Sequence, residues 1–219
     1  MIIALDEEKL VAACQALAER DEDLAFIFHS FGKPPLWARE PDFSTLVHII
    51  LEQQVSVASA KSAFNKLVKY VEILTPENFL KLNDAELKAV GFSRQKTGYA
   101  RGLAEAILEG KINLKGLESL PDEEVKAELK KLKGIGDWTS DIYLLMALLR
   151  SDVMPKGDLA LHVAWQKLKV LEMRPTSEEF FLIARKWQPF RAVAARLLWH
   201  FYLSAKDSKF QMSNSTFQI

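Results

Sequence analysis

The 219-residue sequence predicts an all-α fold. Apolar residues recur at intervals of three and four along most of the chain, which is the spacing of one face of a helix. Convincing alternation of apolar and polar residues, which is typical of half-buried strands, does not occur. Glycine and proline cluster at 32–35, 154–157 and 174–176, between the periodic segments. None of these clusters has the length of a linker between separate domains.

The first half of the chain predicts three helices with clear boundaries. One is expected over residues 43–54, where an apolar stripe begins at Phe43 and ends at Gln54. Ser56 is suited to cap the next helix, and a third is expected over 97–109, closed by Gly110. The predicted inner face of the second helix consists of Val57, Ala60, Phe64, Leu67 and Val71.

Two helices joined by a short turn are expected over about 121–150. Pro121 precedes three acidic residues, which suit the first turn of a helix because its dipole attracts negative charge. The turn itself is LKGIGDWTS at 132–140, and apolar residues then repeat at helical spacing from Trp138 to Leu149. Farther along, residues 190–203 are apolar on nearly every side, which predicts a buried helix.

Composition excludes several classes of protein. The 29 basic and 29 acidic side chains cancel, so net charge does not identify a partner, although six Lys/Arg against two Glu over 88–115 permit a basic patch. Cys14 is the single cysteine, which excludes a disulfide framework and a cysteine-ligated zinc or iron–sulfur site. No apolar run approaches the roughly 20 residues that span a bilayer, and no signal-peptide pattern is present. We therefore expect an intracellular protein of the cytoplasm or nucleoid, without a membrane partner.

The glycines of the turn are suited to binding an anion. Glycine permits the positive φ of a tight reversal and lets a ligand approach backbone N–H groups at the start of the second helix. Lys130, Lys131 and Lys133 add positive charge, so a DNA phosphate would fit this position. The alternative is an ordinary helical corner with Trp138 in the core and the lysines in solvent. Spacing alone leaves both interpretations open.

A family resemblance favours the first interpretation. The segment KLKGIGDWTSDIYLLMAL, followed by MPKGDLALHVAW, resembles the helix-hairpin-helix DNA glycosylase superfamily, and within it the 3-methyladenine DNA glycosylase II branch. Further similar segments bring the resemblance to about residues 34–204; they are PLWAREPDFSTLVHIILEQQVSVASAKSAF, GFSRQKTGYARGLAEAI and WQPFRAVAARLLWHFYLS.

The resemblance implies two interleaved helical subdomains around a cleft. We expect residues 1–48 together with 163–219 to form one, and residues 49–162, which include the hairpin motif, to form the other. It also implies that the partner is double-stranded DNA containing damaged bases, and we expect the protein to act as a monomer.

The superfamily pairs its hairpin with an aspartate about twenty residues beyond the second glycine, and Asp158 stands at that position. The resemblance therefore implies a catalytic role for Asp158. A carboxylate is chemically suitable, since cleavage of an N-glycosidic bond builds positive charge on the sugar and an attacking water needs orientation. The alternative is that Asp158 only caps the helix expected over 159–170. Both roles are compatible, because capping would hold the carboxylate in place.

Two tryptophans occupy positions that the resemblance assigns to the substrate pocket, Trp138 and Trp199. In bifunctional relatives resembling endonuclease III, the residue at the position of Trp138 is a lysine that forms a Schiff base with the sugar. Tryptophan cannot be such a nucleophile, so the resemblance implies a hydrolase without lyase activity. Stacking on indole would favour a positively charged methylated purine by about 0.5–2 kcal/mol. Plain core packing is the alternative for both side chains.

Other positions are implied to contact DNA. Gln54 matches the residue that fills the gap left by a flipped base, although a helix-terminal glutamine bonded to nearby backbone is an equal alternative. Gln53 is expected to be structural. Asp137 is unusual beside a phosphate site, since it could cap the following helix and compete with phosphate. The hairpin residues implied to bind DNA are Lys133, Gly134, Gly136 and Thr139, and the carbonyls implied to hold a monovalent cation are those of Lys130, Leu132 and Gly134.

These observations lead to one main hypothesis and three alternatives. The main hypothesis is a monofunctional DNA glycosylase of base excision repair that flips and hydrolyses alkylated bases of the 3-methyladenine type, without a required cofactor or side-chain metal site. The alternatives are a glycosylase for oxidised or deaminated bases, a non-catalytic DNA-binding module and a generic helical interaction protein.

Overall fold

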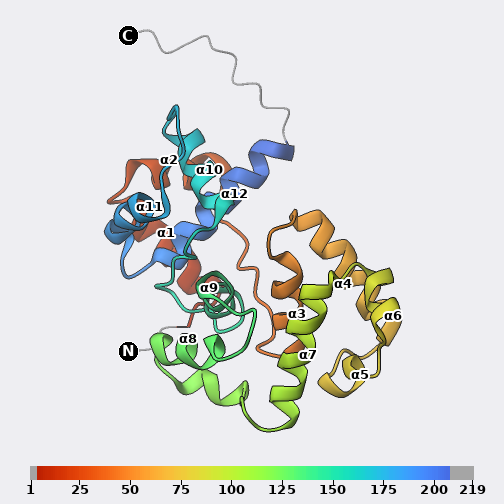
Figure 1. The fold of residues 1–219 in the computed structure, drawn as a ribbon. Helices are drawn as coiled ribbons and strands as arrows, with labels where there is room; N and C mark the ends of the chain where they lie inside the picture. Colours follow the sequence, from red (N-terminus) through yellow and green to blue (C-terminus); the bar gives the residue numbers. More distant parts are fainter. Residues whose placement is uncertain (1–3, 208–219) are drawn as a thin grey trace. The chain divides into compact units, whose positions relative to one another are not determined.

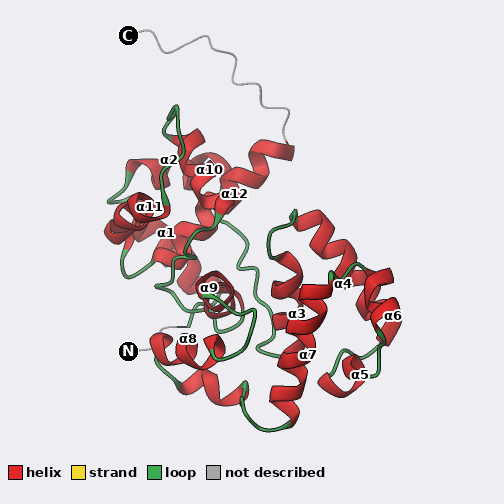
Figure 2. Ribbon diagram, in the orientation of Figure 1, coloured by secondary structure: helices red, strands yellow, loops and turns green. Residues whose placement is uncertain are grey.

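The computed structural model describes residues 4–207, and within that range it contains twelve α-helices and two short 3₁₀ segments (Figures 1 and 2). The extended pairing found between residues 4 and 207 is a single antiparallel bridge from Ala4 to Arg150. The predicted all-α fold is therefore confirmed.

The helices form two compact units. The first comprises Met1–Leu5 and Trp37–Lys156, and the second comprises Asp6–Leu36 and Gly157–Ile219. Segments from both ends of the chain combine in the second unit. The predicted boundaries at 48 and 163 lie at other positions than the boundaries of these units. They would cut through α3 (Phe43–Glu52) and α10 (Leu159–Leu168). Each of those helices lies wholly in one unit. Helix α3 packs on α4 (Val57–Val71), α7 (Arg94–Leu108) and α9 (Asp137–Met146), whereas α10 packs on α12 (Arg191–Asp207).

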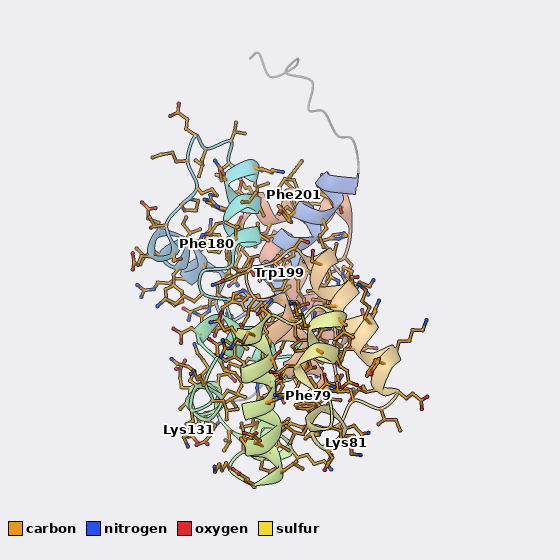
Figure 3. All side chains as sticks on the ribbon, turned by 45° about the vertical axis from the view of Figure 1, so that its right-hand side comes forward. Phe79, Lys81, Lys131, Phe180, Trp199 and Phe201 are labelled. Atoms are coloured by element: carbon orange, nitrogen blue, oxygen red, sulfur yellow. The ribbon has the colours of Figure 1, made fainter. Side chains whose placement is uncertain are left out.

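The first unit holds the hairpin motif on a helical base. Phe79, which is fully buried and labelled in Figure 3, packs edge-on against Phe43 and also contacts Phe92. Phe43 lies on α3 and Phe79 on α5 (Pro76–Leu80), and α7 packs on both of these helices. The remaining elements of this unit are α4 (Val57–Val71), α5 (Pro76–Leu80), α6 (Asp84–Val90), α7 (Arg94–Leu108), η1 (Lys115–Ser119), α8 (Asp122–Lys130) and α9 (Asp137–Met146).

Several predicted boundaries shift in the structure. The helix predicted over 43–54 ends at Glu52, where the ammonium of Lys96 donates a 2.7 Å hydrogen bond to the Leu51 carbonyl. Ser56 does cap α4, since its hydroxyl accepts the Ser59 N–H at 3.2 Å. Val57 was predicted to face inward but is 66% exposed; the buried residues of α4 are Ala60, Ala63 and Leu67.

The second unit is organised around its last helix, α12 (Arg191–Asp207), which packs on α1 (Glu7–Ala18), α2 (Glu22–Phe31) and α10. Residues 192–198 of α12 are fully buried, as the apolar pattern predicted. They include Arg196, whose guanidinium donates to the carbonyls of Leu36 at 2.9 Å and Ala192 at 3.1 Å. Burial lowers the pKa of Arg196 to about 10.

An aromatic cluster forms the other side of this unit. Trp165 on α10, Phe180 on α11 (Ser177–Ala184) and Trp187 on η2 (Arg185–Trp187) make mutual edge-on contacts. The indole N–H of Trp187 donates to Asp21 at 2.7 Å, and the other oxygen of Asp21 caps α2. Asp21 thereby joins the N-terminal helices to the C-terminal segment of the chain.

Candidate functional site

The hairpin consists of α8, a turn over 131–136, and α9. Val125 and Leu129 bury the inner face of α8, while Thr139 and most of the following residues of α9 are buried. The predicted helix–turn–helix is present, although α9 ends at Met146 rather than near residue 150.

The two glycines of the turn do different things. Gly134 has a φ of +93°, and a Cβ added there would lie 2.1 Å from the ring of Tyr99 on α7. Glycine is therefore required at this position both by the left-handed backbone and by the aromatic ring that covers it. Gly136 has an ordinary φ of −106°, and a Cβ added to it would meet nothing within 4 Å. Of the two glycines, Gly136 is the one beside which a ligand has room.

The N-terminus of α9 begins without a side-chain cap. Gly136 is its N-cap residue and has no side chain with which to cap the helix. Ser140 secures that turn from within, because its hydroxyl donates to the carbonyls of Gly136 at 3.0 Å and Asp137 at 2.9 Å. An uncapped helix N-terminus preceded by glycine is a suitable site for an anion.

Asp137 does not cap α9. It is the first residue of α9 and not its cap, and its carboxylate pairs with the Lys130 ammonium at 2.6 Å. That hydrogen bond, with the charge of Lys130, lowers the pKa of Asp137. The anticipated capping of α9 by Asp137 is thus wrong, because the helix begins one residue earlier than expected, with Gly136 as its N-cap, and the Asp137 carboxylate pairs with Lys130.

The three lysines of the hairpin are not equivalent. Lys130 pairs with Asp137, and Lys131, labelled in Figure 3, pairs with Glu128 at 2.6 Å. Lys133 is exposed and makes no ion pair within residues 4–207. Its ammonium is therefore the one that remains most available to an external anion.

Two glutamines follow α3, and their positions differ. The Gln53 amide nitrogen donates to the Gly134 carbonyl at 2.8 Å and to the Thr139 hydroxyl at 3.0 Å. Gln54 is exposed and has a left-handed φ of +56°. Gln54 was predicted to end the helix that begins at Phe43. It lies instead in the turn between α3 and α4. The sequence marked Gln53 as structural but did not reveal its partners, because those lie more than eighty residues away.

Two of the three carbonyls implied to bind a cation, those of Leu132 and Gly134, accept hydrogen bonds from other residues of the chain. The Leu132 carbonyl accepts the Ile135 N–H at 3.1 Å, and the Gly134 carbonyl accepts the Gln53 amide. A carbonyl oxygen has two lone pairs, so each of these oxygens could still bind a cation beside its hydrogen bond. The cation site stays a prediction. Among residues 4–207, no group of three or more His, Cys, Asp or Glu side chains is placed to hold a metal ion.

Asp158 lies in the second unit and caps α10. Its Oδ1 accepts the Leu161 N–H at 3.0 Å and the indole N–H of Trp199 at 3.1 Å. Only 8% of Asp158 is exposed. The capping role considered for this residue is present, and a second donor holds the same oxygen. The carboxylate is thus fixed in direction by two hydrogen bonds.

Trp199 projects from α12 and is 8% exposed (Figure 3). Its contact with Asp158 was not predicted from the sequence, because the two residues are 41 positions apart and an apolar helix does not reveal which side chain carries a polar contact. Trp138 is half-buried at the second position of α9, in the first unit. The roles of both tryptophans as pocket walls remain predictions.

None of the helices described between residues 4 and 207 is both long and apolar enough to cross a bilayer.

Comparison with known proteins identifies relatives of this chain in sequence and in structure. DNA-3-methyladenine glycosylase 1 of Schizosaccharomyces pombe is 32% identical over 165 residues, which cover 74% of this chain and 72% of that protein. The alkylbase DNA glycosidase-like protein of the same yeast is 30% identical over 162 residues, covering 72% of this chain and 76% of the relative. A solved structure of the S. pombe 3-methyladenine DNA glycosylase in complex with abasic DNA has a TM-score of 0.80 at 27% identity, covering 94% of this chain and 100% of that chain.

A family model provides the assignment. Residues 47–189 match the model described as HhH-GPD superfamily base excision DNA repair protein, a range that includes both glutamines, the hairpin and Asp158. The chain therefore belongs to the HhH-GPD superfamily of base excision DNA repair proteins.

Proposed function

We propose that this protein is a monofunctional DNA glycosylase that binds damaged double-stranded DNA and hydrolyses the N-glycosidic bond of alkylated bases of the 3-methyladenine type. Relatives named as 3-methyladenine glycosylases support this activity, as does the fold shared with such an enzyme in complex with abasic DNA. The observation that carries the proposal is the buried Asp158 carboxylate, held by the Leu161 N–H and the Trp199 indole.

Asp158 is the proposed catalytic residue. As the bond to the base breaks, the sugar gains positive charge, which a fixed carboxylate stabilises without reorganising. The same carboxylate can orient the water that attacks the sugar carbon. The reaction consumes water and requires no cofactor.

The hairpin is the proposed DNA-binding element. A backbone phosphate would accept N–H groups at the uncapped start of α9, beside Gly136, with Lys133 supplying charge. Such contacts hold the duplex without distinguishing its sequence, which suits an enzyme that must act at any position. Thr139 would then contribute by fixing the first turn rather than by touching DNA, because it is 2% exposed and accepts the Gln53 amide.

Two further residues complete the proposal. Gln54 would enter the gap left by the flipped base, where its amide can pair with the orphaned base. Trp138 would stack on the extruded alkylated base. Because position 138 carries no amine, no Schiff base can form there and the product is an intact strand with an abasic site.

The test is single-turnover release of 3-methyladenine from methylated duplex DNA by wild type and Asp158→Asn. Asparagine still caps a helix, so the variant should fold normally. Its rate should fall about 100-fold or more, as when a preorganised electrostatic group is lost.

Asp42→Asn is the matched control. Asp42 caps α3 by accepting the Thr45 N–H at 2.8 Å, and it has no proposed role in the reaction. Its substitution should leave the rate unchanged. An Asp158→Asn enzyme that releases base at the wild-type rate would contradict the catalytic role of Asp158.

A further inference from the structure

The side chain of Gln53 joins the two halves of the hairpin site. Its amide nitrogen contacts the Gly134 carbonyl in the turn and the Thr139 hydroxyl in the first turn of α9. The Gly134 oxygen can only accept, so the amide must present its NH₂ group to the hairpin. Those two hydrogens satisfy two acceptors at once, and both acceptors lie in the hairpin, more than eighty residues from Gln53 in the sequence.

The groups that Gln53 holds are themselves immobilised. Gly134 lies between this amide and the Tyr99 ring, which occupies the space that a Cβ would need. Thr139 is 2% exposed. Gln53 is therefore bonded to residues of the hairpin that are packed against other side chains.

The next residue, Gln54, is positioned through the chain on its N-terminal side, where two neighbouring residues are anchored by hydrogen bonds. Upstream, Lys96 anchors the Leu51 carbonyl, and Gln53 is anchored through its side chain. The Gln54 side chain is exposed and makes no hydrogen bond within residues 4–207, although its φ of +56° is uncommon for a residue other than glycine. The hydrogen bonds of its neighbours therefore hold this segment, whereas the Gln54 side chain makes none within residues 4–207.

We propose that Gln53 is a positioning residue that couples the phosphate-binding hairpin to Gln54, so that a duplex bound at the hairpin meets Gln54 in the conformation that enters the base stack. This inference rests on the proposed function. It makes Gln53 specific to the flipping step, since bond cleavage belongs to Asp158. Loss of the amide should thus slow base release only where the damaged base must first be unpaired and replaced.

The experiment is a double-mutant cycle of Gln53→Met and Gln54→Ala, with single-turnover base release as the readout. Methionine matches glutamine in length but donates no hydrogen bond. Each enzyme is assayed on two duplexes, one with the methylated base in a normal pair and one with it opposite an abasic site, where unpairing costs less. Thermal unfolding of every variant is measured in parallel.

Gln53→Met should slow release from the paired duplex about tenfold, consistent with loss of two hydrogen bonds. The loss should shrink below about threefold opposite the abasic site and below about twofold in the Gln54→Ala background. Gln166→Met is the matched control, because Gln166 also donates to two carbonyls, those of Leu171 and Glu172, but has no proposed role. It should leave both rates unchanged.

Equal losses on both duplexes and in both backgrounds would overturn the coupling and show that Gln53 only stabilises the fold. Full activity of Gln53→Met on the paired duplex would overturn it as well. Both results require an active wild type and leave the proposed function intact. A wild type that releases no base from either duplex would instead contradict the proposed function, and this inference with it.

Discussion

At the scale of single residues, the Trp199 side chain can act in two ways, through its aromatic ring and through its hydrogen bond to Asp158. The indole ring can pack or stack, whereas its N–H donates to Oδ1 of the proposed catalytic carboxylate at 3.1 Å. Phenylalanine retains most of the ring and removes the donor, so one substitution distinguishes the two roles.

Trp199→Phe should lower the single-turnover rate of base release about 10- to 100-fold, because a buried hydrogen bond to a charged group contributes about 1.5–3 kcal/mol. Affinity for abasic DNA should change little. Rapid-quench assays and fluorescence anisotropy measure the two quantities. A variant with the wild-type rate would show that the ring alone matters, and Trp187→Phe, which removes the donor to Asp21, is the control for loss of a buried indole bond.

Residues are also where sequence reasoning reached its limit. Asp158 and Gly136 could be proposed from the motif, since each position in the family pattern is marked by residue type. The pairing of Asp137 with Lys130 could not, because a carboxylate at a helix start is equally suited to capping until the neighbouring helix end is placed. Gln53 was hidden for the same reason: its two acceptors are a backbone carbonyl and a hydroxyl that no periodicity marks.

At the scale of elements, the turn between α8 and α9 combines a structural glycine with an open one. Gly134 combines a left-handed φ with the Tyr99 ring in the place of a Cβ, whereas Gly136 has free space around it. The motif therefore predicts different consequences for the same substitution at its two glycines.

Gly134→Ala should destabilise the protein by about 2–4 kcal/mol, since alanine adds both left-handed strain and overpacking against the ring. Gly136→Ala should lower the free energy of unfolding by about 1 kcal/mol or less, but its methyl group should weaken DNA binding. Denaturant unfolding and binding to undamaged duplex test the pair. Similar losses of stability at both positions would contradict this division.

Buried His162 and half-buried His48 predict a pH dependence of stability. Burial lowers the pKa of His162 on α10, although the charge of Asp158 opposes this effect, and burial also lowers the pKa of His48 on α3. The unfolded chain therefore binds more protons below the ordinary pKa of 6.5. Stability is retained above that pH and falls as the solution is acidified through it.

His162→Gln should reduce this acid sensitivity. The free energy of unfolding of the wild type, measured in urea between pH 7.5 and 5.5, should fall more steeply than that of the variant. His29→Gln is the control, since His29 is exposed. Parallel pH profiles for wild type and His162→Gln would show that the buried imidazole does not contribute.

At the scale of the whole molecule, the helical periodicity predicted the fold class but not the division into units. The boundary near 48 would have split α3, whose buried face carries Leu46, Ile49 and Ile50. Only tertiary packing shows that this face belongs with α4, α7 and α9. A local pattern reports which residues are buried and does not report against what.

At the same scale, the residues named in the proposed function are distributed over both units. The hairpin, Gln54 and Trp138 lie in the first, and Asp158 and Trp199 in the second.

Product analysis on DNA containing 3-methyladenine tests the central claim most directly. Wild-type enzyme should release the free methylated base and leave the strand intact, and strand breaks should appear only after alkali is added. Strand cleavage without alkali would contradict hydrolysis without lyase activity, and absence of base release would contradict the glycosylase itself.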